Sequence, residues 1–122
     1  MENAKEEITL PQAQEIVDRW IRTVGVRYFS PLTNMAVLTE EVGEVARIMA
    51  RLHGDQSAKP GEKLNLADEL ADVLWVVLAI ANQNGIDLND AFRNNLMKKN
   101  VRDSRRHIEN SKLHVPSKDT ID

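Results

Sequence analysis

The chain has 122 residues, a formal net charge of −3 and no cysteine. This length suits one domain with a modest core, and the absence of cysteine excludes disulfides and cysteine-based metal sites. The negative charge argues against a DNA-backbone binder, because such domains are usually basic, so we expect no nucleic-acid partner. No apolar run is long enough to cross a bilayer, and residues 1–7 are too charged for a secretory signal. We therefore expect a cytoplasmic protein without a membrane partner.

Apolar residues at helical spacing predict four helices along the chain. The first begins with a capping-box pattern at Thr9 and reaches Gly25. The second begins with a serine cap and a proline at residues 30–31 and ends at Gly54. A loop over residues 54–63 then turns the chain back.

The third predicted helix opens at Asn65 and is apolar on every side between residues 73 and 81, which indicates a central, buried helix. The fourth follows Asp87 and becomes basic toward its end. We expect residues 1–106 to form one helical domain and residues 107–122 to form a mobile tail.

No stretch alternates with a period of two for long enough to predict a strand. The predicted fold class is therefore all-α, as a four-helix antiparallel bundle. A helix that is apolar all round is not fully covered in so small a bundle, so we expect a partner subunit to supply the remaining cover.

Two acidic pairs interrupt the apolar helices. Glu41 and Glu44 on the second helix, and Glu69 and Asp72 on the third, are each three residues apart and so project from one side of their helix. If the helices lie side by side, four carboxylates converge, and they cannot all stay ionised unaided. A divalent cation that prefers oxygen ligands, Mg²⁺ or Mn²⁺, is the simplest remedy. The alternative is that these acids pair on a solvated face with basic neighbours, namely Arg47, Arg51 or Lys63.

Other metal sites do not fit the sequence. A di-iron bundle needs Glu-x-x-His pairs, and the residues three positions before His53, His107 and His114 are alanine or serine. An EF-hand loop is absent as well.

The words Glu40-Glu41-x-x-Glu44 and Glu69-x-x-Asp72, within a likeness that spans about residues 10–106, resemble the signature of MazG-like nucleoside triphosphate pyrophosphohydrolases. These all-α enzymes are related to dimeric dUTPases and dCTP pyrophosphatases. The resemblance implies hydrolysis of nucleoside triphosphates, either dNTPs or non-standard NTPs, to the monophosphate and pyrophosphate. It also implies a homodimer or homotetramer.

By the same resemblance, the Mg²⁺ ligands would be Glu41, Glu44, Glu69 and Asp72. Glu40 and Glu41 would act in catalysis. Glu40 would either contact the metal ligands without binding the metal itself or help to orient the attacking water. A carboxylate within reach of that water can take its proton.

Substrate contacts are expected at four further residues. Trp75 lies one turn after Asp72 and can stack on a base or pack at a subunit contact, and Asn34 stands near the start of the second helix. Lys99 and Arg102, at the basic end of the fourth helix, would neutralise phosphate charge. Trp20 belongs to the apolar stripe of the first helix and is expected in the core.

Two alternatives stay open from the sequence. A phosphoribosyl-ATP pyrophosphohydrolase resembles the same superfamily and breaks the same type of bond. A non-catalytic helical interaction module would carry the acids only to solvate a face.

Overall fold

The computed structural model describes residues 6–116 and divides the chain into two compact units, Met1–Leu88 and Asn89–Asp122. The first unit holds three long helices, which are α1 (Leu10–Thr23), α2 (Pro31–His53) and α3 (Leu66–Gln83). From Leu88 onward follow α4 (Leu88–Lys98), a π-helical turn (Lys99–Asp103), α5 (Ser104–Ile108) and a 3₁₀ turn (Ser111–His114). Residues 6–116 contain no strand, so the predicted all-α class is confirmed.

The helix starts are set by local side chains, as predicted. The Thr9 amide donates to Gln12 Oε1 at 2.8 Å, and Thr9 Oγ1 accepts from the Gln12 amide at 3.3 Å, which completes the capping box. The side chains of Ser30 and Asn65 each accept from the backbone amide three residues later, at 3.2 and 3.1 Å. These caps fix where α1, α2 and α3 begin.

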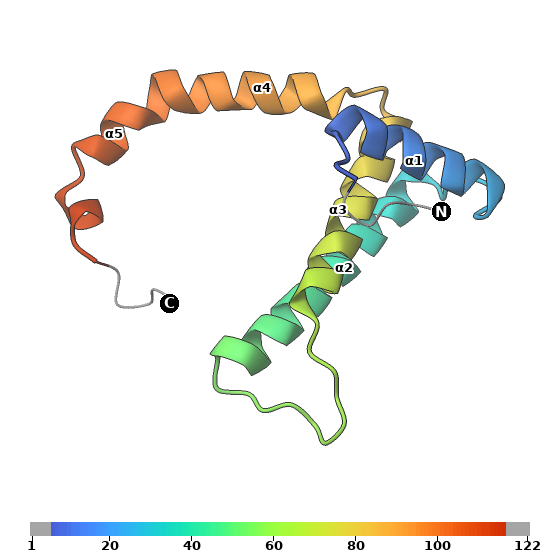
Figure 1. The fold of residues 1–122 in the computed structure, drawn as a ribbon, viewed down its shortest axis with the longest axis horizontal. Helices are drawn as coiled ribbons and strands as arrows, with labels where there is room; N and C mark the ends of the chain where they lie inside the picture. The colour runs from blue at the N-terminus through green and yellow to red at the C-terminus, as the bar shows by residue number, and fades with distance from the viewer. Residues whose placement is uncertain (1–5, 117–122) are drawn as a thin grey trace. The chain divides into compact units, whose positions relative to one another are not determined.

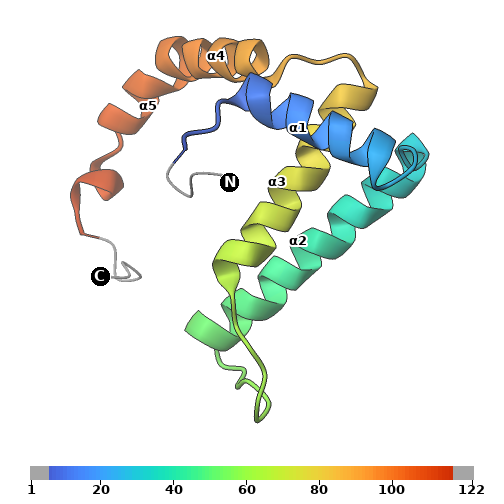
Figure 2. The same ribbon diagram turned by 45° about the vertical axis from the view of Figure 1, so that its right-hand side comes forward.

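Helix α3 is the centre of the first unit, because it packs against both α1 and α2 (Figure 1). Helices α2 and α3 lie side by side and antiparallel, joined by the loop over residues 54–65, while α1 lies across them (Figure 2). Val17 and Ile21 of α1 meet Leu78 and Ala79 of α3 in the buried core. This arrangement holds the acidic part of α2 against the first turns of α3.

The second face of α3 is left uncovered by the described residues of the first unit. Val76, Leu78 and Ala79 are at most 6 % exposed, whereas Leu70 and Leu74 are 52 % and 49 % exposed. The burial predicted for residues 73–81 therefore holds for the face turned toward α1 and α2. Cover of the other face by a partner subunit stays a prediction.

A seam of hydrogen bonds ties α1 and the following turn to the end of α3. Gln14 Nε2 donates to Asn82 Oδ1 at 3.1 Å and to the Ile86 carbonyl at 2.7 Å. The Tyr28 hydroxyl donates to Asp18 Oδ1 at 2.6 Å and accepts from Asn82 Nδ2 at 3.2 Å. The bond from Tyr28 lowers the pKa of Asp18, and burial raises the pKa of Tyr28. The seam fixes the Tyr28 ring beside α3.

The second unit is helical through most of residues 89–116. His114 Nε2 lies 2.7 Å from the Ile108 carbonyl oxygen, within the segment that we expected to be mobile. Residues 117–122 of the predicted tail lie outside the described residues, and the predicted boundary at residue 106 stays a prediction. None of the described helices combines the length and the apolar character needed to span a bilayer.

Candidate active site

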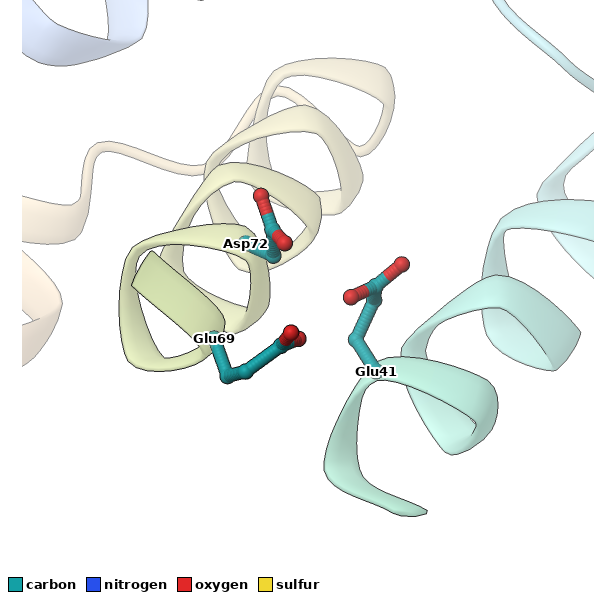
Figure 3. Close-up of side chains that lie close together, drawn as sticks. All are labelled: Glu41, Glu69 and Asp72. Carbon is teal, nitrogen blue, oxygen red and sulfur yellow. The ribbon is translucent and has the colours of Figure 1, made fainter. Parts of the chain in front are cut away.

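Three carboxylates from two helices meet on one side of the first unit. Glu41 comes from α2, and Glu69 and Asp72 come from successive turns of α3, with the three side chains pointing toward one another (Figure 3). Each offers one carboxylate oxygen, and these oxygens all lie within 4.8 Å of one another. Carboxylate oxygens are the ligands that Mg²⁺ and Mn²⁺ prefer, so this donor set fits a divalent cation.

The three carboxylates of this cluster repel one another, and Arg47 compensates them only from a distance, through its charge interaction with Glu69. Partial burial raises the pKa of Glu41 above its ordinary value, and the negative charges of Asp72, Glu69, Glu44 and Glu40 raise it further. Among residues 6–116, no lysine or arginine forms an ion pair with Glu41, Glu69 or Asp72. A cation bound between them would offset this repulsion.

The other two predicted acids lie outside the cluster. Glu44 Oε2 accepts a hydrogen bond from Arg47 Nε at 3.0 Å. Glu44 is therefore paired with a basic neighbour, as in the alternative interpretation of the sequence. Glu40 is exposed to solvent. The structure thus brings together three of the five predicted acids, and the roles of Glu40 and Glu44 stay predictions.

An ion-pair network beside the cluster was not predicted from the sequence. Glu62, in the loop between α2 and α3, forms ion pairs with two arginines. Its Oε2 lies 2.6 Å from Arg47 Nη1, and its Oε1 lies 3.2 Å from Arg51 Nε. A hydrogen bond from the Lys59 amide, followed by the charges of Arg51 and Arg47, lowers the pKa of Glu62. Arg47 therefore links the loop to Glu44. A single glutamate in a loop carries no periodic signal, which is why its partner could not be read from the sequence.

A cavity of about 120 Å³ lies between α1, α2 and α3. Both residues predicted to contact the nucleoside, Asn34 and Trp75, line it. Trp20, expected in the core, is 46 % exposed and lines the same cavity, with its ring centroid 5.3 Å from that of Trp75 in an edge-on arrangement. Tyr28 and Phe29 also contribute to the wall. We call this cavity the aromatic pocket.

A chain of amides supports Asn34 in this pocket. Asn34 is only 5 % exposed, and its Nδ2 donates to Gln83 Oε1 at 2.8 Å. Gln83 Nε2 in turn donates to the Phe29 carbonyl at 2.6 Å. Gln83 was not predicted from the sequence. The available signal was a run of three amide side chains, residues 82–84, directly after the apolar part of α3.

The two basic residues predicted to bind phosphate belong to the second unit. Lys99 opens the π-helical turn, and Arg102 lies within it. The Arg102 side chain is 75 % exposed and its Nε lies 3.5 Å from Asp103 Oδ1. Short π-helical segments are often found at functional sites.

A known protein family matches the part of the chain that contains these acids. The MazG nucleotide pyrophosphohydrolase domain family matches residues 29–107, which include all five acids. The chain belongs to the MazG family. It is accordingly a nucleotide pyrophosphohydrolase, a hydrolase of phosphoanhydride bonds with a nucleotide substrate. MazG enzymes generally use a divalent metal, in agreement with the donor set.

Similar proteins support the same assignment. The chain is 39 % identical to Bacillus subtilis (strain 168) protein YpjD over 99 residues, which are 80 % of this chain and 89 % of YpjD. The crystal structure of YpjD has a TM-score of 0.69 to this chain. A Bacillus-conserved MazG protein, a nucleotide pyrophosphohydrolase, is 40 % identical with a TM-score of 0.68, over 83 % of this chain and 99 % of that one. The family and enzyme class predicted from the sequence are confirmed.

Proposed function

We propose that this MazG protein hydrolyses nucleoside triphosphates, either dNTPs or non-standard NTPs, to the monophosphate and pyrophosphate in a Mg²⁺-dependent reaction, with Mn²⁺ as a substitute. The observation that carries the proposal is the convergence of Glu41, Glu69 and Asp72 within 4.8 Å. A bound divalent ion would supply neutralisation of phosphate charge, which is the main requirement of phosphoryl transfer.

The remaining acids complete this proposal. Glu44 joins the ligands when its carboxylate leaves Arg47, which still has Glu62 as a partner at 2.6 Å. Glu41 and Glu40 orient the attacking water and accept its proton.

The proposed substrate contacts are of two kinds, to the nucleoside and to the phosphates. Asn34 and Trp75 contact the nucleoside, since a pocket with aromatic walls and one buried amide suits a base. Lys99 and Arg102 neutralise phosphate oxygens, and Arg102 has the fork geometry that suits a phosphate. Residues 1–106 act as the catalytic domain.

The assembly that we propose is a homodimer or homotetramer. Val42 and Met49 on α2, and Leu70 and Leu74 on α3, are between 39 % and 52 % exposed. A second copy of the chain would remove this apolar surface from water. Light scattering after size-exclusion chromatography measures the mass directly, and a monomer at micromolar concentration would contradict this part of the proposal.

The proposed reaction is tested by its products. The protein is incubated with Mg²⁺ and a panel of common and damaged dNTPs and NTPs, with phosphoribosyl-ATP as a further substrate. We expect pyrophosphate and a monophosphate from the triphosphates. Release of inorganic phosphate and a diphosphate would contradict the proposed bond, and turnover of phosphoribosyl-ATP alone would favour that alternative.

A matched pair of variants on α3 tests the ligand assignment. Asp72→Asn removes a charge from the cluster, whereas Asp68→Asn makes the same change in the first turn of the same helix, outside the cluster. We expect Asp72→Asn to lower turnover by more than about a hundredfold, because a lost ligand removes several kcal/mol of charge stabilisation. Asp68→Asn should stay near the parent activity. Equal activity of both variants would overturn the assignment of Asp72.

A further inference from the structure

The hydrogen bonds around Asn34 have only one consistent polarity. The Phe29 carbonyl is purely an acceptor, so the Gln83 group that faces it at 2.6 Å must be the amide nitrogen. The Gln83 oxygen then faces Asn34, which must donate through Nδ2 at 2.8 Å. A backbone carbonyl thus determines the orientation of two side-chain amides in series, which cannot be read from either amide alone.

This polarity decides what Asn34 offers to the aromatic pocket. Its Nδ2 is engaged by Gln83, while its Oδ1 has no partner among residues 6–116. Asn34 is one of the residues that line the pocket, although it is only 5 % exposed. A nearly buried acceptor disfavours a ligand that leaves it unpaired and favours one that brings an N–H group.

The size of the pocket limits the ring that it can hold. Its volume is about 120 Å³, and a protein cavity of about 150 Å³ holds one benzene ring. The pocket is therefore slightly smaller than a cavity that holds one six-membered ring, so a single ring needs only a small widening, whereas a two-ring purine needs a much larger one. The walls include Trp20 and Trp75, whose rings suit contact with a flat aromatic ligand.

We propose that Gln83 is a positioning residue that fixes the Asn34 amide, so that the pocket selects a pyrimidine base with an N–H group facing Asn34 Oδ1. The exocyclic amine of cytosine and the ring N–H of uracil or thymine both meet this requirement. The inference rests on the proposed function, in which Asn34 and Trp75 contact the nucleoside.

The test uses the protein's own fluorescence. The chain has two tryptophans, and both line the pocket, so a change in tryptophan emission reports this site without any turnover. Dissociation constants are measured for CMP, UMP and AMP, and for the monophosphate of 2-pyrimidinone riboside, which lacks both N–H groups. We expect CMP and UMP to bind about two- to tenfold more tightly than the 2-pyrimidinone nucleotide, the usual effect of one hydrogen bond. AMP should bind more weakly than CMP.

The variant Gln83→Met tests whether the hydrogen bond from Asn34 to Gln83 orients the Asn34 amide. It leaves Asn34 free to turn, so the preference for CMP over the 2-pyrimidinone nucleotide should fall below about twofold, while the affinity of the latter is unchanged. Gln56→Met is the matched control, because it removes an amide that accepts from Arg51 in the loop between α2 and α3, away from the pocket walls, and it should keep the preference.

Three results would overturn the inference. One is equal binding of CMP and the 2-pyrimidinone nucleotide by the parent protein, a comparison that needs no variant. Another is a preference that survives in Gln83→Met. The last is unchanged emission with every nucleotide, which would also remove the proposed nucleoside contacts of Asn34 and Trp75.

Discussion

Glu41→Gln should make the metal-free protein more stable, although it alters a residue of the catalytic centre. At 4.8 Å, the largest separation among these carboxylate oxygens, two unit charges repel by about 1 kcal/mol in water and about 3.5 kcal/mol at an effective dielectric constant of 20. The change removes the repulsion of Glu41 with both Glu69 and Asp72. Partial exposure and salt reduce the effect, so we expect a gain of about 1 to 3 kcal/mol. For a unit of this size, that raises the melting temperature by at least about 4 °C.

Thermal unfolding in EDTA at low ionic strength measures this gain. Glu15→Gln on α1 is the matched control, since the Glu15 carboxylate has an exposed partner, Arg19, at 3.0 Å, and its loss should change little. Addition of Mn²⁺ should stabilise the parent protein and the Glu15 variant more than the Glu41 variant, because binding to the native state adds stability according to affinity. Destabilisation of Glu41→Gln in EDTA, together with an undiminished response to Mn²⁺, would refute the reasoning.

The raised pKa of Glu41 also determines how the stability of the protein depends on pH. Because the pKa of Glu41 is raised in the folded protein, the native state binds more protons than the unfolded state between the ordinary carboxyl pKa and this raised pKa. The stability of the metal-free parent should therefore fall as the pH rises through this window. Glu41→Gln lacks this contribution, so its advantage should be largest above the window and should disappear in acid. An advantage that grows toward low pH would contradict the assignment.

Three further changes test the surroundings of the site. Tyr28→Phe loses the 2.6 Å bond to Asp18 and should lower the free energy of unfolding by about 1 to 2 kcal/mol in urea titrations, and an unchanged midpoint would count against the seam. Glu62→Gln should speed hydrogen exchange at the Lys59 amide, which donates to Glu62, and equal exchange in both proteins would argue against this anchor. Gly85→Ala places a side chain at a φ of +64° and should cost about 1 kcal/mol in the same urea titrations, although no atom lies near the added methyl group. A stabilised Gly85→Ala protein would contradict that conformation.

Much of the first unit could be predicted because its signals are local. The caps at Thr9, Ser30 and Asn65 act within three residues, so the sequence shows both partners at once. The meeting of Glu41 with Glu69 and Asp72 was also predictable. It needs only two adjacent antiparallel helices and the three-residue spacing of the acids on α3.

The contacts that were missed join residues far apart in the sequence. The Asn34–Gln83 bond spans 49 positions and depends on how far α2 and α3 are displaced along each other, which no spacing rule gives. Glu44 is a different case, because its near neighbour Arg47 binds its carboxylate at 3.0 Å, a pairing that the sequence also allowed, and its role as a metal ligand stays a prediction. Trp20 has the spacing of a core residue, yet only the packing against Trp75 shows that it borders a pocket.

The most direct test of the central claim is a Mn²⁺ titration followed by electron paramagnetic resonance, which counts free ions in solution. The parent protein and Asp68→Asn should remove Mn²⁺ from solution, with Mg²⁺ competing for the same site, because the carboxylates of Glu41, Glu69 and Asp72 converge. Glu41→Gln and Asp72→Asn should bind Mn²⁺ at least about tenfold more weakly, the loss expected for one charged ligand. Equal binding by all four proteins, or no binding by the parent protein, would contradict a metal centre at these three acids.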